Sequence, residues 1–120
     1  MRVRSSDSVT IISLDREATL QRLREAARSL VEERNDVDSV WLFGSLAKGD
    51  AVPGSDADIV VVLKQSDRRP EDRLTDFVDA FSDAGIPVEV LAYTQDEIDK
   101  MQADGNLFIK GILEHRTFLT

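Results

Sequence analysis

Residues 44–58 read Gly-Ser-Leu-Ala-Lys-Gly-Asp-Ala-Val-Pro-Gly-Ser-Asp-Ala-Asp, and this stretch decides the fold class. A Gly-Ser turn is followed by two carboxylates, Asp56 and Asp58, at the start of the apolar run 59–63. Side chains alternate along a strand, so both carboxylates are expected on one face with Cα atoms about 6.5 to 7 Å apart. Two carboxylates at that spacing can share divalent metal ions.

Helix and strand signals alternate along the rest of the chain. Apolar residues recur at steps of three and four in the helical segments, and the strand segments are rich in β-branched and aromatic residues. In the first half of the chain we expect a helix over 15–35, a strand over 37–43 and a central strand over 58–63. A helix after residue 70 should end before Gly85 and be followed by a strand over 86–93. We then expect a helix capped by Thr94 and Glu97, a short helix from residue 107 and a last strand over 117–119. This order predicts an α/β (α+β) fold in which helices flank a small mixed β-sheet.

Length and composition narrow the class of protein. The 120 residues, 42% of them hydrophobic, are enough for one domain, which we expect over residues 15–120. Residues 1–14 are interpreted as an N-terminal arm or an edge strand. No apolar run is long enough to span a membrane, no secretory signal is recognisable and cysteine is absent, so we expect a cytoplasmic protein.

The charge balance bears on the choice of substrate. The chain has 23 acidic and 15 basic residues, a formal net charge of -8, which argues against binding long nucleic acids through a basic surface. A nucleoside triphosphate remains compatible with this charge because Mg²⁺ can bridge acidic side chains and phosphates.

A third carboxylate, Glu89, interrupts the apolar strand 86–93. We expect that strand to be largely buried, where a lone charge costs several kcal/mol unless it is compensated. If Glu89 faces the same way as Asp56 and Asp58, three carboxylates converge and divalent cations would compensate their repulsion. Each acid also has an ordinary interpretation: the aspartates as turn residues, and Glu89 as a partner of Arg68 or as a solvent-facing edge residue.

The combination of these residues resembles the minimal nucleotidyltransferases of the DNA polymerase β superfamily, of the antitoxin type. That family has a Gly-Ser turn, a spacer of about this length, Asp-x-Asp at the start of the next strand and a third acid one strand later. The residues that match are Gly44, Ser45, Asp56, Asp58 and Glu89. The resemblance covers residues 15–120 and includes the segment 106–110 near the end.

The resemblance implies a nucleotidyltransferase fold and a Mg²⁺-dependent transfer. Asp56, Asp58 and Glu89 would be the catalytic acids and would hold two Mg²⁺ ions, and the acceptor oxygen would attack the α-phosphorus as pyrophosphate leaves. Contacts to the nucleotide would come from Gly44, Ser45, Lys48 and Ser55. Many members have arginine where this chain has Lys48, so Lys48 is either a point-charge phosphate contact or a solvated loop residue.

The resemblance also implies a partner. Larger members of the superfamily carry a second domain that grips base and acceptor, and 120 residues leave no space for one. Minimal nucleotidyltransferases of this type are often paired with a HEPN-domain toxin, so the expected reaction transfers AMP from ATP to a hydroxyl, such as a tyrosine, of that protein. Two alternatives stay open: a catalytically silent module that neutralises a partner by occlusion, and a transferase acting on a small hydroxylated molecule.

Overall fold

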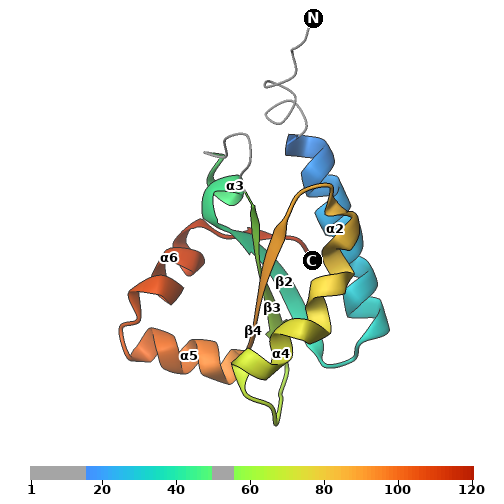
Figure 1. Ribbon diagram of the computed structural model, residues 1–120. Coiled ribbons are helices and arrows are strands. Elements are labelled where there is room, and N and C mark those ends of the chain that lie inside the picture. The colour runs from blue at the N-terminus through green and yellow to red at the C-terminus, as the bar shows by residue number, and fades with distance from the viewer. Residues whose placement is uncertain (1–15, 50–55) are drawn as a thin grey trace, which may run out of the picture.

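The computed structural model describes residues 16–49 and 56–120 (Figure 1). The expected arm at residues 1–14 lies outside the described part of the chain. The elements, in chain order, are α2 (Arg16–Glu33), β2 (Val37–Phe43), α3 (Gly44–Lys48), β3 (Ala57–Leu63), α4 (Pro70–Phe77), the 3-10 helix η1 (Val78–Ala84), β4 (Val88–Thr94), α5 (Gln95–Ala103), α6 (Leu107–His115) and β5 (Thr117–Phe118).

The strands of the described residues form one mixed sheet in the order β4-β3-β2-β5. β2 runs antiparallel to β3 and to β5, while β3 and β4 are parallel and are joined by a crossover through α4 and η1. Figure 1 shows α5 and α6 on one side of the sheet and α2 and α4 on the other. The predicted α/β (α+β) fold, a small mixed sheet flanked by helices, is confirmed.

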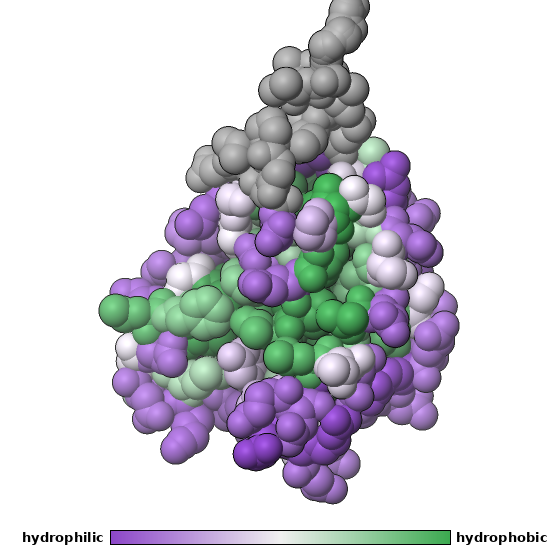
Figure 2. All heavy atoms as spheres, viewed as in Figure 1, coloured by the Kyte–Doolittle hydropathy of each residue, from purple (hydrophilic) through white to green (hydrophobic). Residues whose placement is uncertain are grey.

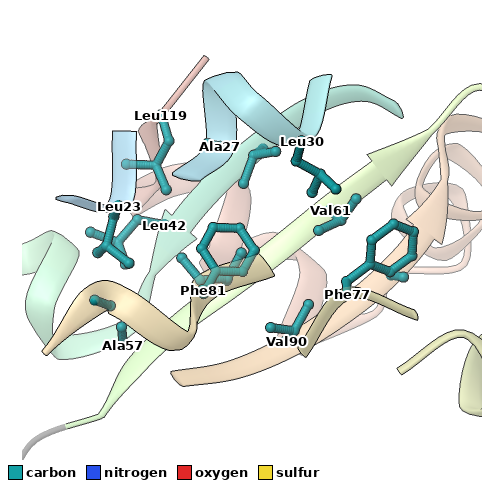
Figure 3. Packing of buried hydrophobic residues seen from close by; sticks show 14 of the residues in the cluster. Leu23, Ala27, Leu30, Leu42, Ala57, Val61, Phe77, Phe81, Val90 and Leu119 are labelled. Atoms are coloured by element: carbon teal, nitrogen blue, oxygen red, sulfur yellow. The ribbon is translucent and has the colours of Figure 1, made fainter. Parts of the chain in front are cut away.

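One face of the sheet carries the larger hydrophobic cluster. The apolar stripe of α2, which includes Leu23 and Ala27, packs there against Leu42 of β2 and Val61 of β3, and all four side chains are fully buried. Phe81 of η1 joins this cluster, as Figure 3 shows. Burying a side chain of this size contributes about 1.5 to 3 kcal/mol, so this layer fixes β2 and β3 at the centre of the sheet.

The opposite face of the sheet is covered by the two C-terminal helices. Trp41 of β2 and Val60 of β3 pack there against Ile98 of α5 and Ile109 of α6. Because side chains alternate along a strand, Phe43 lies on the same face as Trp41, and Asp58 on the same face as Val60. The carboxylate of Asp58 therefore lies on the face of the sheet that α5 and α6 cover.

The boundaries of β4 and of the helix before it differ from the sequence prediction. β4 begins at Val88 and not at residue 86, because Pro87 has no N–H and its carbonyl accepts the Ala57 N–H at 2.9 Å. The predicted helix ahead of Gly85 is divided: α4 ends at Phe77, and the 3-10 helix η1 continues to Ala84. Gly85 follows with φ +84°, a conformation that glycine adopts without strain.

The start of α5 agrees with the predicted capping box. The Glu97 N–H donates to Thr94 Oγ1 at 3.1 Å, and the Thr94 N–H donates to Glu97 Oε1 at 2.8 Å. Glu97 also accepts hydrogen bonds from Arg73 of α4, at 2.7 Å to Oε1 and 3.0 Å to Oε2. Arg73 is buried and donates a further bond to the Ala92 carbonyl of β4. One arginine therefore joins α4, β4 and α5.

β4 is less buried than expected: three of its seven residues are buried, three are half-buried and one is exposed. β4 is an edge strand, and the side chain of Glu89 is exposed. Arg68, considered as a partner for Glu89, instead forms an ion pair with Asp76. Glu89 therefore pays no large desolvation cost and is free to take part in chemistry at the surface.

The described ranges contain no helix that is both long enough and apolar enough to cross a membrane.

Figure 2 shows apolar surface extending from the side of α6 across the exposed edge of the sheet. The largest exposed apolar side chains are Leu107 and Phe108 at the start of α6, Phe118 in β5, and Leu74 and Val78 beside β4.

Candidate active site

The Gly-Ser turn after β2 forms the first residues of the short helix α3. Gly44 has φ +77°, which allows the chain to leave β2 and enter this helix within one residue. Ser45 follows in the first turn of α3 and is half-buried, while Lys48 is exposed in its last turn. Gly49 then ends the helix in the left-handed conformation, with φ +82°.

Arg16, at the start of α2, holds this turn in place. Its guanidinium donates to the Leu46 carbonyl from Nε at 3.2 Å and from Nη2 at 3.1 Å. The last carbonyls of a helix have no partners within the helix, so this arginine satisfies groups that α3 cannot satisfy itself. The sequence interpretation did not assign a role to Arg16, and nothing local in the sequence signals a contact across thirty residues.

Asp58 lies directly against the turn. It is the antiparallel register partner of Phe43, the residue before Gly44. A Cβ atom added to Gly44 would overlap Oδ2 of Asp58 and would come within 3.2 Å of its Cγ. The carboxylate therefore occupies the space that any other residue at position 44 would fill, which gives a structural reason for glycine there.

Glu89 lies beside Asp58 on the neighbouring strand. The two are register partners in the parallel pair β3–β4, so their side chains leave the sheet on the same face from strands about 4.8 Å apart. The pKa of Asp58 is raised above its ordinary value, first by burial and then by the negative charges of Glu89 and Asp56. Asp58 is thus close enough to both of the other predicted acids to be repelled by them.

Two further predicted site residues, Asp56 and Ser55, lie outside the strands of the sheet or outside the described residues. Asp56 is exposed and comes one residue before the start of β3. Ser55 lies outside the described residues. Within residues 16–49 and 56–120, no three His, Asp or Glu side chains are already arranged to hold a metal ion. The acids are therefore gathered at one end of the sheet without forming a closed ligand set.

The acids do not line the hollows identified among the described residues. The hollow of about 360 Å³ is lined by residues of α2 and η1, and the hollow of about 500 Å³ by Trp41 and Arg116 among others. Neither is lined by Asp58 or Glu89.

Sequence comparison decides the family. Residues 20–119 match the family described as the nucleotidyltransferase domain. The chain belongs to this family. A nucleotidyltransferase domain transfers a nucleotidyl group from a nucleoside triphosphate, and such domains generally use a divalent metal ion. No match was found among curated proteins.

Structural comparison gives the same fold. The chain is similar to a crystal structure of a protein from Sulfolobus solfataricus that carries a provisional assignment as a nucleotidyltransferase. The two share 21% sequence identity and superpose with a TM-score of 0.63, over 92% of this chain and 86% of the other. At this identity the likeness concerns the nucleotidyltransferase fold alone.

The oxygen donors of the three predicted acids fit a divalent cation such as Mg²⁺. Asp56, Asp58 and Glu89 offer only carboxylate oxygens, which Mg²⁺ prefers over nitrogen or sulfur. A cation between them would also offset the repulsion that raises the pKa of Asp58. The residues present therefore suit the metal chemistry that the family uses.

Proposed function

We propose that this nucleotidyltransferase domain transfers AMP from ATP to a hydroxyl group of a partner protein. The observation that supports it most is the register pairing of Asp58 with Glu89, together with the electrostatic coupling of both Glu89 and Asp56 to Asp58. Three coupled carboxylates beside a Gly-Ser turn suit a reaction in which phosphate charge must be neutralised and an oxygen nucleophile aligned.

In the proposed reaction, the acceptor oxygen forms a bond to the α-phosphorus of ATP. The bond from that phosphorus to the oxygen bridging to the β-phosphorus breaks, and pyrophosphate leaves. The proton of the acceptor hydroxyl passes to a carboxylate oxygen of Glu89, which is exposed and therefore reachable by an acceptor from outside.

The three acids, Glu89 included, are also proposed as metal ligands, and the other site residues as contacts to the phosphates. Asp56, Asp58 and Glu89 would hold Mg²⁺, which when bound neutralises phosphate charge and lowers the pKa of the acceptor hydroxyl. The hydroxyl of Ser45 donates to a phosphate oxygen, and Gly44 leaves room for the Asp58 carboxylate. Lys48 and Ser55 are proposed as further phosphate contacts.

The exposure of Asp56 and Glu89 supports a macromolecular acceptor. A hydroxyl carried on the surface of another protein could reach exposed carboxylates without entering a pocket. Following the resemblance to minimal nucleotidyltransferases, we propose a HEPN-domain toxin as that protein, with this chain as its antitoxin.

The test is a labelling reaction with ATP that carries ³²P at the α-phosphate. The full chain and Mg²⁺ are incubated with a HEPN-domain protein from the same organism, and label is sought on that protein. Asp56→Asn and Asp58→Asn should each lower labelling at least about 100-fold, while Asp67→Asn, in an exposed loop away from the sheet end, should not. Labelling that survives both substitutions would sink the proposal.

A second candidate function is a binding module that neutralises a partner by covering it. It is favoured by one observation: no three acids of the described residues form a closed metal site. In that case the partner should stay inhibited without nucleotide and with the Asp58→Asn chain. Mass spectrometry of the incubated partner and of small hydroxylated compounds separates protein acceptors from metabolite acceptors.

A further inference from the structure

Phe108 and Leu107 stand at the start of α6 with their side chains largely in solvent. Leu107 is 80% exposed and Phe108 is 51% exposed. Exposing the large apolar side chains of two consecutive residues gives up the stabilisation that their burial would bring. The proposed transfer of AMP does not yet use either residue.

The position of Phe108 relates it to the acids. Its ring meets the ring of Phe43 edge to face, with centroids 5.8 Å apart. Phe43 is in turn the register partner of Asp58, a relation in which Cα atoms lie about 4.5 to 5.5 Å apart. Phe108 therefore stands one side chain away from the central carboxylate of the site.

Within the part of the chain that the structure describes, Phe118 is also half-exposed, but unlike Phe108 it has a cation beside its ring. Phe118 is 54% exposed, but the guanidinium of Arg116 lies over its ring at 4.6 Å and Trp41 meets its edge. Among the described residues, no cation and no second aromatic ring apart from Phe43 contacts the ring of Phe108. With about half of its surface in solvent, the side chain of Phe108 is accessible to a ligand.

The strand order separates an acceptor side of the site, at Glu89, from a donor side, at Phe43. Glu89, Asp58 and Phe43 lie in a row across β4, β3 and β2. Glu89, on the exposed edge, is the residue assigned to the acceptor hydroxyl. Phe43 leads directly into Gly44 and Ser45, which are assigned to the phosphates of the donor. Phe108 accordingly belongs to the donor side.

We propose that the nucleobase of the donor nucleoside triphosphate stacks on the ring of Phe108. This inference rests on the proposed nucleotidyl transfer and adds to it a residue that binds the base. Stacking on an aromatic ring is tolerant of base identity, because every base has a flat π-face. Phe108 therefore favours purines over pyrimidines through their larger face, and it discriminates weakly between ATP and GTP.

The test compares binding of ATP with binding of tripolyphosphate, which has the phosphates without the nucleoside. Both are titrated in Mg²⁺ by calorimetry against the full wild-type chain, Phe108→Leu and Phe118→Leu. Leucine keeps an apolar side chain and removes the aromatic face, and thermal melts verify that each variant is folded. Phe118→Leu is the matched control, since its ring has nearly the same exposure but lies beside Arg116.

Phe108→Leu should weaken ATP binding about tenfold, within the range of one base stacked on one ring, and leave tripolyphosphate binding unchanged. Phe118→Leu should change neither. Nuclear Overhauser effects from adenine H2 or H8 to the Phe108 ring should appear in the wild-type complex. CTP and UTP should bind more weakly than ATP and GTP, and this difference should shrink in Phe108→Leu.

Three results overturn the inference and leave nucleotidyl transfer standing. These are unchanged ATP binding in Phe108→Leu, equal weakening of ATP and tripolyphosphate, and an effect confined to the KM of the acceptor. If the wild-type chain binds neither ATP nor tripolyphosphate in Mg²⁺, the proposed function fails, and the inference fails with it.

Discussion

The carboxylate of Asp58 occupies the space that a side chain at Gly44 would need. Oδ2 of Asp58 lies where the Cβ atom of any other residue would be placed, and Gly44 also has a positive φ of +77°. Two separate constraints, one steric and one conformational, thus act on one position next to the proposed active site.

Gly44→Ala should lower both stability and nucleotidyl transfer. The left-handed backbone costs a residue with a Cβ about 1 to 2 kcal/mol, and the overlap must displace the Asp58 carboxylate. Gly49→Ala is the control, because Gly49 has φ +82° and nothing lies within 4 Å of its added Cβ. Urea melts and labelling assays should show a larger loss for Gly44→Ala; equal losses would mean that the contact with Asp58 has no consequence.

Asp58→Asn should make the metal-free protein more stable at pH 7 while it abolishes transfer. The pKa of Asp58 is raised in the folded state, so ionising it costs more in the fold than in the unfolded chain. The wild type is therefore expected to lose stability as the pH rises through this raised pKa. Below the unfolded value of about 3.9 the difference between the two proteins should vanish.

The measurement is urea unfolding in EDTA between pH 3 and 8, with Asp79→Asn in η1 as an exposed acid remote from the site. Adding Mg²⁺ and ATP should then stabilise the wild type and not Asp58→Asn. A variant that is less stable than wild type at pH 7 in EDTA would show that the charge of Asp58 is compensated in the fold.

Glu89→Gln should reduce turnover more than nucleotide binding. In the proposed reaction Glu89 accepts the proton of the acceptor hydroxyl, a task that contributes about 100- to 10,000-fold in comparable sites. Its side chain is exposed, so the substitution should leave stability nearly unchanged. Single-turnover rates and ATP titrations separate the two quantities, with Glu114→Gln on α6 as control. A loss confined to ATP affinity would contradict the assignment.

Arg73→Met should destabilise the fold by about 1 to 3 kcal/mol, since it removes the buried donor to the Ala92 carbonyl and to Glu97, whose own side chain is about one third exposed. The hydrogen bonds from Arg73 hold the pKa of Glu97 below its ordinary value of 4.5. A lowered pKa means that the ion pair stabilises the fold above about pH 4.5 and that this contribution is lost as the pH falls through the lower folded value.

Glu97→Gln isolates the charge in the same pair, because glutamine can still accept the Thr94 N–H of the capping box. The difference in unfolding free energy between wild type and Glu97→Gln should be greatest near neutral pH and shrink on acidification. A difference that stays constant from pH 7 to pH 3 would show that the charge contributes nothing.

The sequence predicts best what is local. Strand β3 follows from a continuous apolar run, the start of α5 from Thr94 and Glu97 three residues apart, and the turn at Gly44 from a glycine that follows an apolar strand. Each pattern reports interactions among residues near one another in the chain, where spacing alone fixes geometry.

What the sequence does not predict depends on distant pairing. The exposure of Glu89 follows from β4 being at the edge of the sheet, and strand order is set by packing across the whole domain. The contact of Arg16 with the Leu46 carbonyl spans thirty positions. The exposure of Phe108 depends on how α6 lies against Phe43, although the same apolar pattern would fit a buried helix.

The bond from Arg73 to the Ala92 carbonyl also affects how this chain behaves among copies of itself. An open edge strand invites another strand to add to the sheet, which is a route to aggregation. β4 is the longer of the two edge strands, and the outward carbonyl of Ala92 is already occupied by a buried guanidinium. A strand from a second molecule would have to displace the guanidinium of Arg73. The arginine that joins α4 to α5 therefore also opposes the addition of a further strand to the sheet.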